Sequence, residues 1–249
     1  MKDILLRIQK IKNTVYDGIF PPRCPGCDEI LFDKNSAIRP CICDKCSAKI
    51  KYISEPMCLR CGKQLEDSEA EFCHDCKNKE FFYNRGIAAF SYSEIMKHSM
   101  YQFKYNNRRE YAKFYAMAVE RQFADTIRSW QPQVLIPVPL HKTRLRKRGY
   151  NQAEVLAKAI GERMDIPVDG SILVRVKKTI PQKMLGQKER LMNVERAFQT
   201  ASNSIKYKKV ILVDDIYTTG TTINECARIL KENGADTVFF VAACIGNGF

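Results

Sequence analysis

The chain has 249 residues and a formal net charge of +13, and hydrophobic residues make up 45% of it. This length accommodates one medium-sized domain and a small module. No apolar run approaches the roughly 18 residues needed to cross a membrane, and Lys, Arg and Gln interrupt the amphipathic N-terminus too often for a secretory signal. These features argue against a membrane-spanning or secreted protein, so we expect a cytoplasmic one.

The first third of the chain is predicted to hold an amphipathic helix at residues 1–19 and a cysteine-rich module at residues 20–80. Four C-x2-C pairs have the spacing that places two thiolates on one tetrahedral zinc ion: Cys24/Cys27, Cys43/Cys46, Cys58/Cys61 and Cys73/Cys76. Sequential pairing predicts two structural zinc ions in a double ribbon. A disulfide framework is the alternative, and the lack of a secretory signal argues against it. Cys41 and His74 adjoin the pairs, so either could replace a predicted ligand.

The basic charge lies outside this module. Residues 1–84 carry 14 Lys and Arg against 13 Asp and Glu, whereas residues 85–249 carry 27 against 15. Eight thiolates and two zinc ions would make the module net acidic. Since neutralisation of phosphates dominates affinity for nucleic acid, we predict that the module alone binds DNA poorly.

Aromatic and basic residues alternate in the next segment, as on surfaces that stack the bases of single-stranded DNA. The residues are Tyr101, Phe103, Tyr105 and Tyr111, with Lys104, Arg108 and Arg109 between them. The alternative, which we favour, is that these rings pack against a sheet.

A predicted buried strand at residues 134–138 leads into a strongly basic segment with Lys142, Arg144, Arg146, Lys147 and Arg148, and a helical pattern starts near Gln152. So many donors and positive charges suit a pyrophosphate group. A solvated charged turn is the alternative. Further on, the strand-like residues 171–176 precede a long, polar and basic segment, residues 180–200.

Residues 210–222 give the most specific pattern. A predicted buried parallel strand, residues 210–213, ends at Asp214 and Asp215. The loop that follows opens a helix and consists of Thr218, Thr219, Gly220, Thr221 and Thr222. Hydroxyls and backbone N–H groups at a helix N-terminus suit a phosphate, and carboxylates at a strand end can accept hydrogen bonds from vicinal sugar hydroxyls. The pattern therefore predicts a sugar-phosphate site; the alternative is an acidic turn and a capped helix without a ligand.

Beyond this loop, Ile223, Cys226, Ala227 and Leu230 form an apolar helical face that stops near Gly234, and residues 237–245 are predicted to form a buried strand. Cys226 and Cys244 are expected in the core and not as nucleophiles. We predict an α/β fold for residues 85–249, with a doubly wound parallel sheet, preceded by the small zinc-ribbon module.

Residues 210–222 resemble the signature of type I phosphoribosyltransferases, which bind phosphoribosyl pyrophosphate together with magnesium. The resemblance implies that Asp214 and Asp215 hold the ribose hydroxyls and that the threonine-rich loop holds the 5-phosphate. It also implies that the basic segment containing Arg144 and Arg148 binds pyrophosphate, and that residues 180–200 form a flexible loop that closes over it.

Nearly the whole chain resembles the ComF-type family of phosphoribosyltransferase-like proteins, which is linked to DNA uptake in bacterial competence. Beside the cysteine pairs and the signature loop, the matching positions are Phe103-Lys104-Tyr105, residues 137–152, Gln182, Leu185, Arg190 and Asn193. The resemblance implies that Lys104 binds the substrate and that Arg190 takes part in catalysis. It implies displacement of pyrophosphate from the anomeric carbon by an unidentified acceptor. The alternative is a non-catalytic factor that binds single-stranded DNA or docks onto proteins of the uptake machinery.

Overall fold

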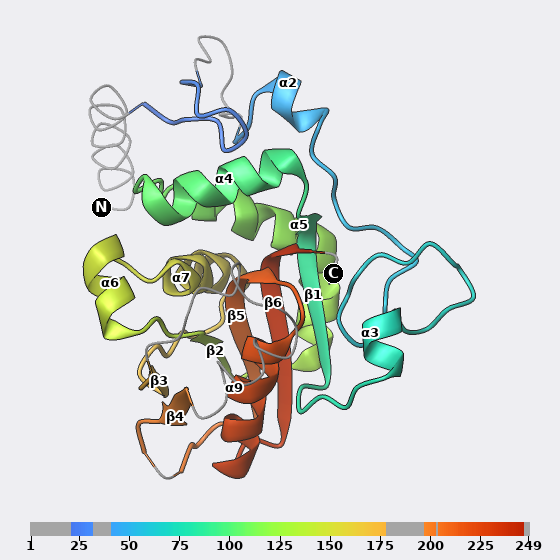
Figure 1. The fold of residues 1–249 in the computed structure, drawn as a ribbon, viewed down its shortest axis with the longest axis vertical. Coiled ribbons are helices and arrows are strands. Elements are labelled where there is room, and N and C mark those ends of the chain that lie inside the picture. The colour runs from blue at the N-terminus through green and yellow to red at the C-terminus, as the bar shows by residue number, and fades with distance from the viewer. Residues whose placement is uncertain (1–20, 32–40, 178–196, 203, 247–249) are drawn as a thin grey trace, which may run out of the picture.

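The structure is a computed structural model that describes residues 21–31, 41–177, 197–202 and 204–246. The helix expected at residues 1–19 lies outside these ranges. Arg190, with Gln182, Leu185 and Asn193, also lies outside them (Figure 1).

A four-stranded parallel sheet forms the centre of the molecule (Figure 1). Its order across the sheet is β1 (Arg85–Ser91), β6 (Thr237–Ile245), β5 (Lys209–Tyr217) and β2 (Val134–Pro137). The strands read as nearly continuous apolar runs, which is typical of a parallel sheet covered on both faces. Alternate residues supply the two cores: Leu212 belongs to one core, and Val213 belongs to the other.

Helices cover both faces of this sheet, which confirms the predicted doubly wound α/β fold. α4 (Glu94–Tyr105), α5 (Tyr111–Trp130) and α7 (Gln152–Met164) supply one core. On the other face lie α9 (Thr221–Glu232) and an antiparallel pair made of β3 (Leu173–Arg175) and β4 (Phe198–Thr200). As predicted, Cys226 and Cys244 are fully buried.

Two segments differ from the sequence-based predictions. β5 continues to Tyr217 because β6 goes on pairing with it as far as Ile245, so Asp214 and Asp215 lie inside the strand and not after it. The basic segment, for which no helix was predicted, forms a short helix, α6 (Lys142–Arg148). The His141 ring accepts a hydrogen bond from the first turn of this helix, and Gly149 ends it in the left-handed region with φ of 82°.

The cysteine-rich module contains two short helices, α2 (Asp44–Ser47) and α3 (His74–Lys77); α2 lies next to α4, and α3 lies beside β1 (Figure 1). The chain between them runs along the edge of the sheet. Ile53 N donates to Ala89 O at 3.0 Å, and Ser91 N donates to Lys51 O at 3.0 Å. The module therefore covers an edge strand that would otherwise offer unpaired backbone groups.

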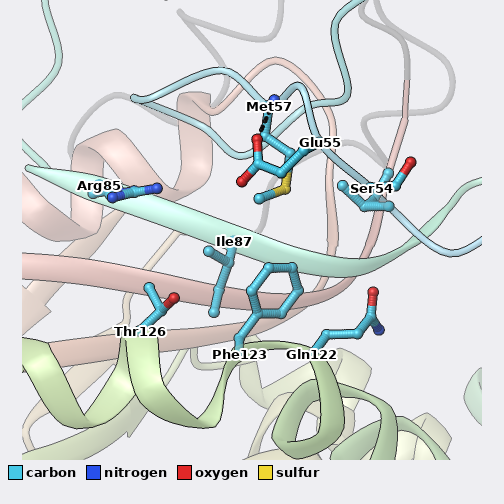
Figure 2. Close-up of a pocket in the computed structure, with 9 residues that line it drawn as sticks. Ser54, Glu55, Met57, Arg85, Ile87, Gln122, Phe123 and Thr126 are labelled. Atoms are coloured by element: carbon cyan, nitrogen blue, oxygen red, sulfur yellow. Dashed lines mark hydrogen bonds between the residues drawn. The ribbon is translucent and has the colours of Figure 1, made fainter.

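A cavity of about 250 Å³ lies between this edge segment and α5 (Figure 2). Ile53 and Met57 line it from the module, Ile87 from β1 and Phe123 from α5. α5 is kinked at Phe123, where φ is −132° and ψ is 15°. At this point the boundary between the module and the sheet contains an open pocket.

Candidate functional site

The acidic pair and the threonine-rich loop lie together at the carboxyl end of β5. The loop leads directly into α9, whose first backbone N–H groups have no partner within the helix. Gly220 caps this helix with φ of 76°, and a Cβ atom at this position would lie 2.4 Å from the Tyr217 hydroxyl. Thr219 Oγ1 and Thr221 Oγ1 are 3.0 Å apart. The loop thus gathers hydroxyl and amide donors where only glycine allows the turn.

The two carboxylates differ in their surroundings. Asp214 is partly exposed, whereas only 6% of the Asp215 side chain is exposed. Asp214 Oδ1 accepts a hydrogen bond from Asp215 N at 2.8 Å. Burial, and then repulsion by the Asp215 carboxylate, raise the pKa of Asp214 to about 7. Asp214 is therefore the carboxylate that faces the site, and it titrates near neutral pH.

Lys104 reaches the acidic pair from the last turn of α4. Its Nζ lies 2.9 Å from Asp215 Oδ1, and only 15% of the lysine side chain is exposed. Burial opposes the charge of Lys104, but Asp215 more than compensates and raises the pKa of the lysine. The second oxygen of Asp215 is buried, and it has no hydrogen-bond partner among the residues that the structure describes. Asp215 is thus engaged with Lys104, and this pairing was not apparent from the sequence.

Basic side chains gather beside these groups. Burial, and next the Arg148 guanidinium, lower the pKa of Arg144. The pKa of Arg175 on β3 is also lowered, first by burial and next by Arg144. The Asp214 carboxylate has the opposite effect and raises the pKa of Arg175. The predicted Arg144 and Arg148 are therefore within electrostatic range of each other. Arg175 was not predicted from the sequence, although it is a basic residue at the end of a short strand just before the polar segment.

The aromatic residues between 101 and 111 divide into two kinds. Phe103 and Tyr111 are buried, as expected for packing, whereas Tyr101 is 53% and Tyr105 56% exposed. The two exposed rings are neighbours, with centroids 5.1 Å apart. The guanidinium of Arg148 lies over the Tyr105 ring at 5.1 Å. Tyr101 and Tyr105 from α4 thus lie next to Arg148 from α6 at the surface. We call these three residues the Tyr-Arg surface.

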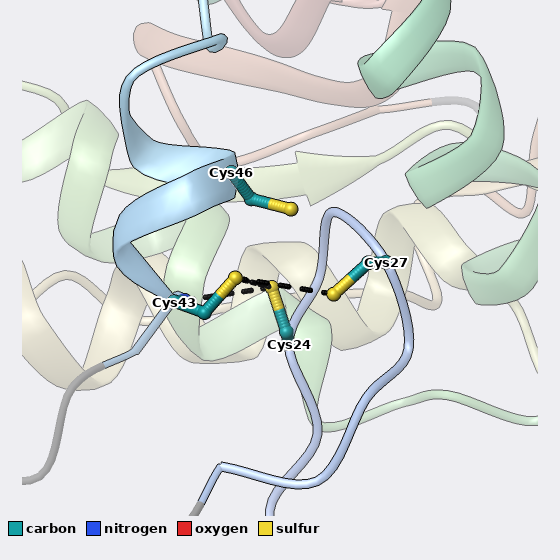
Figure 3. Close-up of side chains that lie close together, drawn as sticks. All are labelled: Cys24, Cys27, Cys43 and Cys46. Atoms are coloured by element: carbon teal, nitrogen blue, oxygen red, sulfur yellow. Dashed lines mark hydrogen bonds between the residues drawn. The ribbon is translucent and has the colours of Figure 1, made fainter.

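The eight paired cysteines form two groups in the predicted sequential order. The first cluster consists of Cys24, Cys27, Cys43 and Cys46 (Figure 3). The second consists of Cys58, Cys61, Cys73 and Cys76. Within each cluster the sulfur atoms lie within 4.8 Å of one another. Zinc–sulfur bonds of about 2.3 Å at tetrahedral angles place sulfurs about 3.8 Å apart. The Sγ atoms of Cys61 and Cys73 are 3.7 Å apart. Both clusters therefore fit structural zinc.

The remaining cysteines do not alter this assignment. No disulfide joins any of the eleven cysteines, all of which lie in the described ranges, so the structure agrees with two metal clusters and not with the disulfide framework. Cys41 and His74 belong to neither cluster. Each predicted zinc site is thus complete without them.

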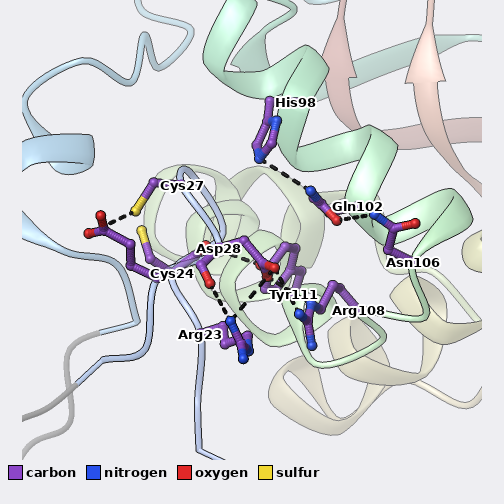
Figure 4. A network of polar contacts seen from close by, with 10 residues as sticks. Arg23, Cys24, Cys27, Asp28, His98, Gln102, Asn106, Arg108 and Tyr111 are labelled. Atoms are coloured by element: carbon purple, nitrogen blue, oxygen red, sulfur yellow. Dashed lines mark hydrogen bonds and ion pairs between the residues drawn. The ribbon is translucent and has the colours of Figure 1, made fainter.

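The first cluster is attached to the turn between α4 and α5 (Figure 4). Arg108 Nη2 donates to Asp28 Oδ2 at 2.7 Å, and the Tyr111 hydroxyl donates to Asp28 Oδ1 at 2.5 Å. The same hydroxyl lies 3.1 Å from the carbonyl oxygen of Cys24. Burial raises the pKa of Asp28, but hydrogen bonds from Arg108 and Tyr111 outweigh it and lower the pKa overall.

Comparison with protein families gives two matches. The double zinc ribbon domain matches residues 15–77, and the phosphoribosyl transferase domain matches residues 114–247. Within the described ranges, no helix is both long and apolar enough to span a membrane.

Proteins similar to this chain include competence protein F of Haemophilus influenzae, 34% identical over 79% of this chain and 87% of its own length. Competence protein ComFC of Bacillus subtilis is 31% identical over 78% of this chain and 79% of its own length. The DNA utilization protein YhgH of Escherichia coli is 27% identical over 82% of this chain and 89% of its own length. Among solved structures, a purine phosphoribosyltransferase from Pyrococcus horikoshii aligns with 53% of this chain and 74% of its own, at 16% identity and a TM-score of 0.34.

Proposed function

The chain belongs to the ComF-type family of phosphoribosyltransferase-like proteins, and from this premise we propose that it binds phosphoribosyl pyrophosphate at the carboxyl end of β5. The observation that carries the proposal is the placement of Asp214 beside the N-terminus of α9. A carboxylate that accepts from ribose hydroxyls and a loop of donors for a phosphate stand next to each other there. Arg144 and Arg148 supply positive charge for the pyrophosphate group.

The reaction that we propose is displacement of pyrophosphate. The bond between the anomeric carbon and the pyrophosphate oxygen breaks, an acceptor atom bonds to the same carbon, and pyrophosphate leaves with the bonding electron pair. The basic side chains stabilise the charge that develops on the leaving group, and Asp214 orients the ribose. Arg190, which lies outside the described residues, is a further proposed catalytic group.

Magnesium is the proposed companion of the substrate, and when bound it supplies further positive charge at the pyrophosphate oxygens. Apart from the cysteine clusters, the described residues contain no group of three or more metal-binding side chains. A magnesium ion that keeps several water ligands and binds through substrate oxygens fits such surroundings. The proposed contact from the protein is therefore limited to Asp214, because Asp215 is engaged with Lys104.

Calorimetric titration with phosphoribosyl pyrophosphate and magnesium tests this proposal. We expect saturable binding by the wild type, and at least a tenfold loss of affinity in Asp214→Asn, because an amide is a weaker acceptor for sugar hydroxyls than a carboxylate. Asp236→Asn, which changes an exposed acidic group just before β6 at the opposite end of the sheet, serves as the matched control. A wild type that shows no heat of binding would overturn the proposal. A screen of acceptors for pyrophosphate release then decides whether catalysis follows.

The second candidate function is a non-catalytic role in DNA uptake, in which the protein holds single-stranded DNA or docks onto uptake proteins. Its support is the Tyr-Arg surface, since exposed rings can stack on bases while cations meet phosphates. The names of the relatives, which refer to competence and DNA utilization, agree with either function. A cytoplasmic location is part of both proposals, because zinc thiolate sites and free cysteines persist in a reducing compartment. Pyrophosphate release with any acceptor would favour the enzyme.

A further inference from the structure

The second cysteine cluster is built into the same core as the base of the phosphate loop. Cys58 and Cys61 are 1% exposed, and they belong to one buried cluster with Tyr83 and Tyr217. Tyr83 follows the last cysteine of the module, whereas Tyr217 is the last residue of β5 before the loop. The zinc-binding part and the ligand-binding part are therefore connected through packed side chains.

The connection is a compact set of three rings. The hydroxyls of Tyr83 and Tyr217 are 2.6 Å apart and buried. Tyr217 stacks on Phe240 with ring centroids 4.6 Å apart and an angle of 2° between the planes. Tyr83 meets the same Phe240 edge-on at 5.0 Å. Such contacts fix both the position and the rotation of the Tyr217 ring, because each ring is held on more than one side.

Tyr217 in turn supports the loop. A Cβ atom added at Gly220 would lie 2.4 Å from the Tyr217 hydroxyl and 2.9 Å from the carbon that bears it, so the loop backbone rests directly on this ring. Gly246 N donates to Tyr217 O at 2.9 Å, and Asn224 N donates to Gly220 O at 2.8 Å. A shift of the ring therefore moves the turn on which the predicted phosphate donors stand.

A second contact joins the segment that directly follows the module to α9, the helix that begins in the loop. Phe82 N donates to Asn224 Oδ1 at 2.6 Å, in the first turn of α9. Arg60, which lies between Cys58 and Cys61, donates from Nη1 to Tyr83 O at 3.1 Å. The backbone around Tyr83 is thus held by the second cluster on one side and by α9 on the other.

Among the described residues, the first cluster does not belong to the core that contains Tyr83 and Tyr217. Its contacts through Asp28, Arg108 and Tyr111 go to the turn between α4 and α5. Gly26 packs closely against Ile95 at the start of α4, since a Cβ atom there would lie 3.1 Å from the Ile95 side chain. The two cysteine clusters therefore offer an internal comparison, one joined to the phosphate loop and one not.

We propose that Tyr83 and Tyr217 are positioning residues through which the second cysteine cluster holds the Thr218–Thr222 loop in its phosphate-binding conformation. Loss of metal from the second cluster then loosens the loop, whereas loss of metal from the first cluster leaves it in place. The loop is thus sensitive to the metal content of a module that does not itself contact the ligand. The consequence for binding rests on the proposed sugar-phosphate function, and the consequence for loop order does not.

Amide hydrogen exchange in the zinc-loaded full-length protein tests loop order. Tyr83→Phe and Tyr217→Phe each remove one hydroxyl, and we expect the amides of Asn224 and Gly246 to exchange about fivefold faster, since a broken hydrogen bond of ordinary strength corresponds to such a factor. Zinc content should stay unchanged. The matched control is Tyr115→Phe, which removes a buried hydroxyl bonded to Ser99 at 2.7 Å away from the loop. Unchanged rates in both variants, or an equal acceleration in the control, overturns the proposal.

Ligand binding gives the second measurement, with ribose 5-phosphate as the probe. We expect Cys58→Ser with Cys61→Ser to lower affinity at least tenfold, and Cys24→Ser with Cys27→Ser to change it less than twofold. Equal losses in the two pairs would contradict the proposal, because they would indicate general destabilisation. If the wild type binds no ribose 5-phosphate, the proposed sugar-phosphate site fails instead, and the exchange rates still decide the role of the two tyrosines.

Discussion

Asp214 and Asp215 are neighbours in sequence, but the fold gives them different chemistry. The side chains of adjacent strand residues point to opposite faces, so one carboxylate meets Lys104 from α4 while the other stays open to the site. The sequence identified both carboxylates as candidates from their place at a strand end. It did not separate their roles, because the partner lysine lies more than a hundred residues earlier in the chain.

The pKa of Asp214 leads to a prediction about stability. The folded-state value of about 7 is above the ordinary value of 3.8, so the folded protein binds this proton more tightly than the unfolded chain does. The contribution of this proton to the stability of the fold is fully present below pH 3.8 and is lost as the pH rises through 7. We therefore expect Asp214→Asn to be more stable than the wild type at pH 8 and nearly equal to it near pH 4. Urea unfolding of both proteins at the two pH values measures this. If the variant and the wild type differed in free energy of unfolding by the same amount at both pH values, Asp214 would not have a raised pKa in the fold.

The Lys104–Asp215 pair gives a second prediction at this scale. Removing one partner leaves a buried charge without compensation, which typically costs about 3–5 kcal/mol. Lys104→Met and Asp215→Asn should each destabilise the fold by an amount of this order, and the double variant should lose clearly less than the sum. Denaturant unfolding of the three variants forms the cycle. Additive losses would mean that the two side chains do not interact in solution.

At the scale of elements, the sequence was most informative where a single segment carries both packing and chemistry. β5 and α9 were predicted because an apolar run, a glycine turn and a helical apolar face follow one another directly. α6 was not predicted, since five of its seven residues are Lys or Arg and none is buried. Its formation depends on capping by His141 and on the turn at Gly149, which composition does not reveal. Arg175 was missed because no local motif marks it.

α6 carries a testable charge effect. Replacing Arg144, Arg146 and Arg148 with Ala should weaken phosphoribosyl pyrophosphate and single-stranded DNA alike, because both ligands are anionic and α6 supplies positive charge beside the site. The slope of log affinity for an oligonucleotide against log salt should flatten by roughly 0.7 for each phosphate that the variant no longer neutralises. Fluorescence anisotropy at several salt concentrations measures it. The control has the same change of charge on α5, at Lys113, Arg121 and Arg128. Equal effects of the two triple variants would indicate a non-specific response to net charge.

At the scale of the whole molecule, the module and the sheet are unequally connected. The spacing of the cysteines was enough to predict two clusters and their order, because each C-x2-C unit can place both thiolates on one zinc ion and sequential units close short ribbons. The spacing did not reveal that the second cluster shares a core with β5 and β6. Such sharing arises from contacts between segments far apart in the chain, so it becomes visible only when the chain is folded. The boundary near residue 80 is thus a boundary in sequence more than in packing.

This unequal connection predicts different results for two truncations. Removing residues 1–50 takes away the first cluster and leaves the strand edge covered, since the segment at Lys51 and Ile53 keeps its hydrogen bonds to β1. This variant should fold and contain one zinc ion per chain, against two in the full protein. Removing residues 1–80 also exposes the edge of β1 and takes Cys58 and Cys61 out of the main core. It should lose cooperative thermal unfolding. Elemental analysis and circular dichroism measure both outcomes, and a cooperatively folded 81–249 fragment would show that the sheet does not depend on the second ribbon.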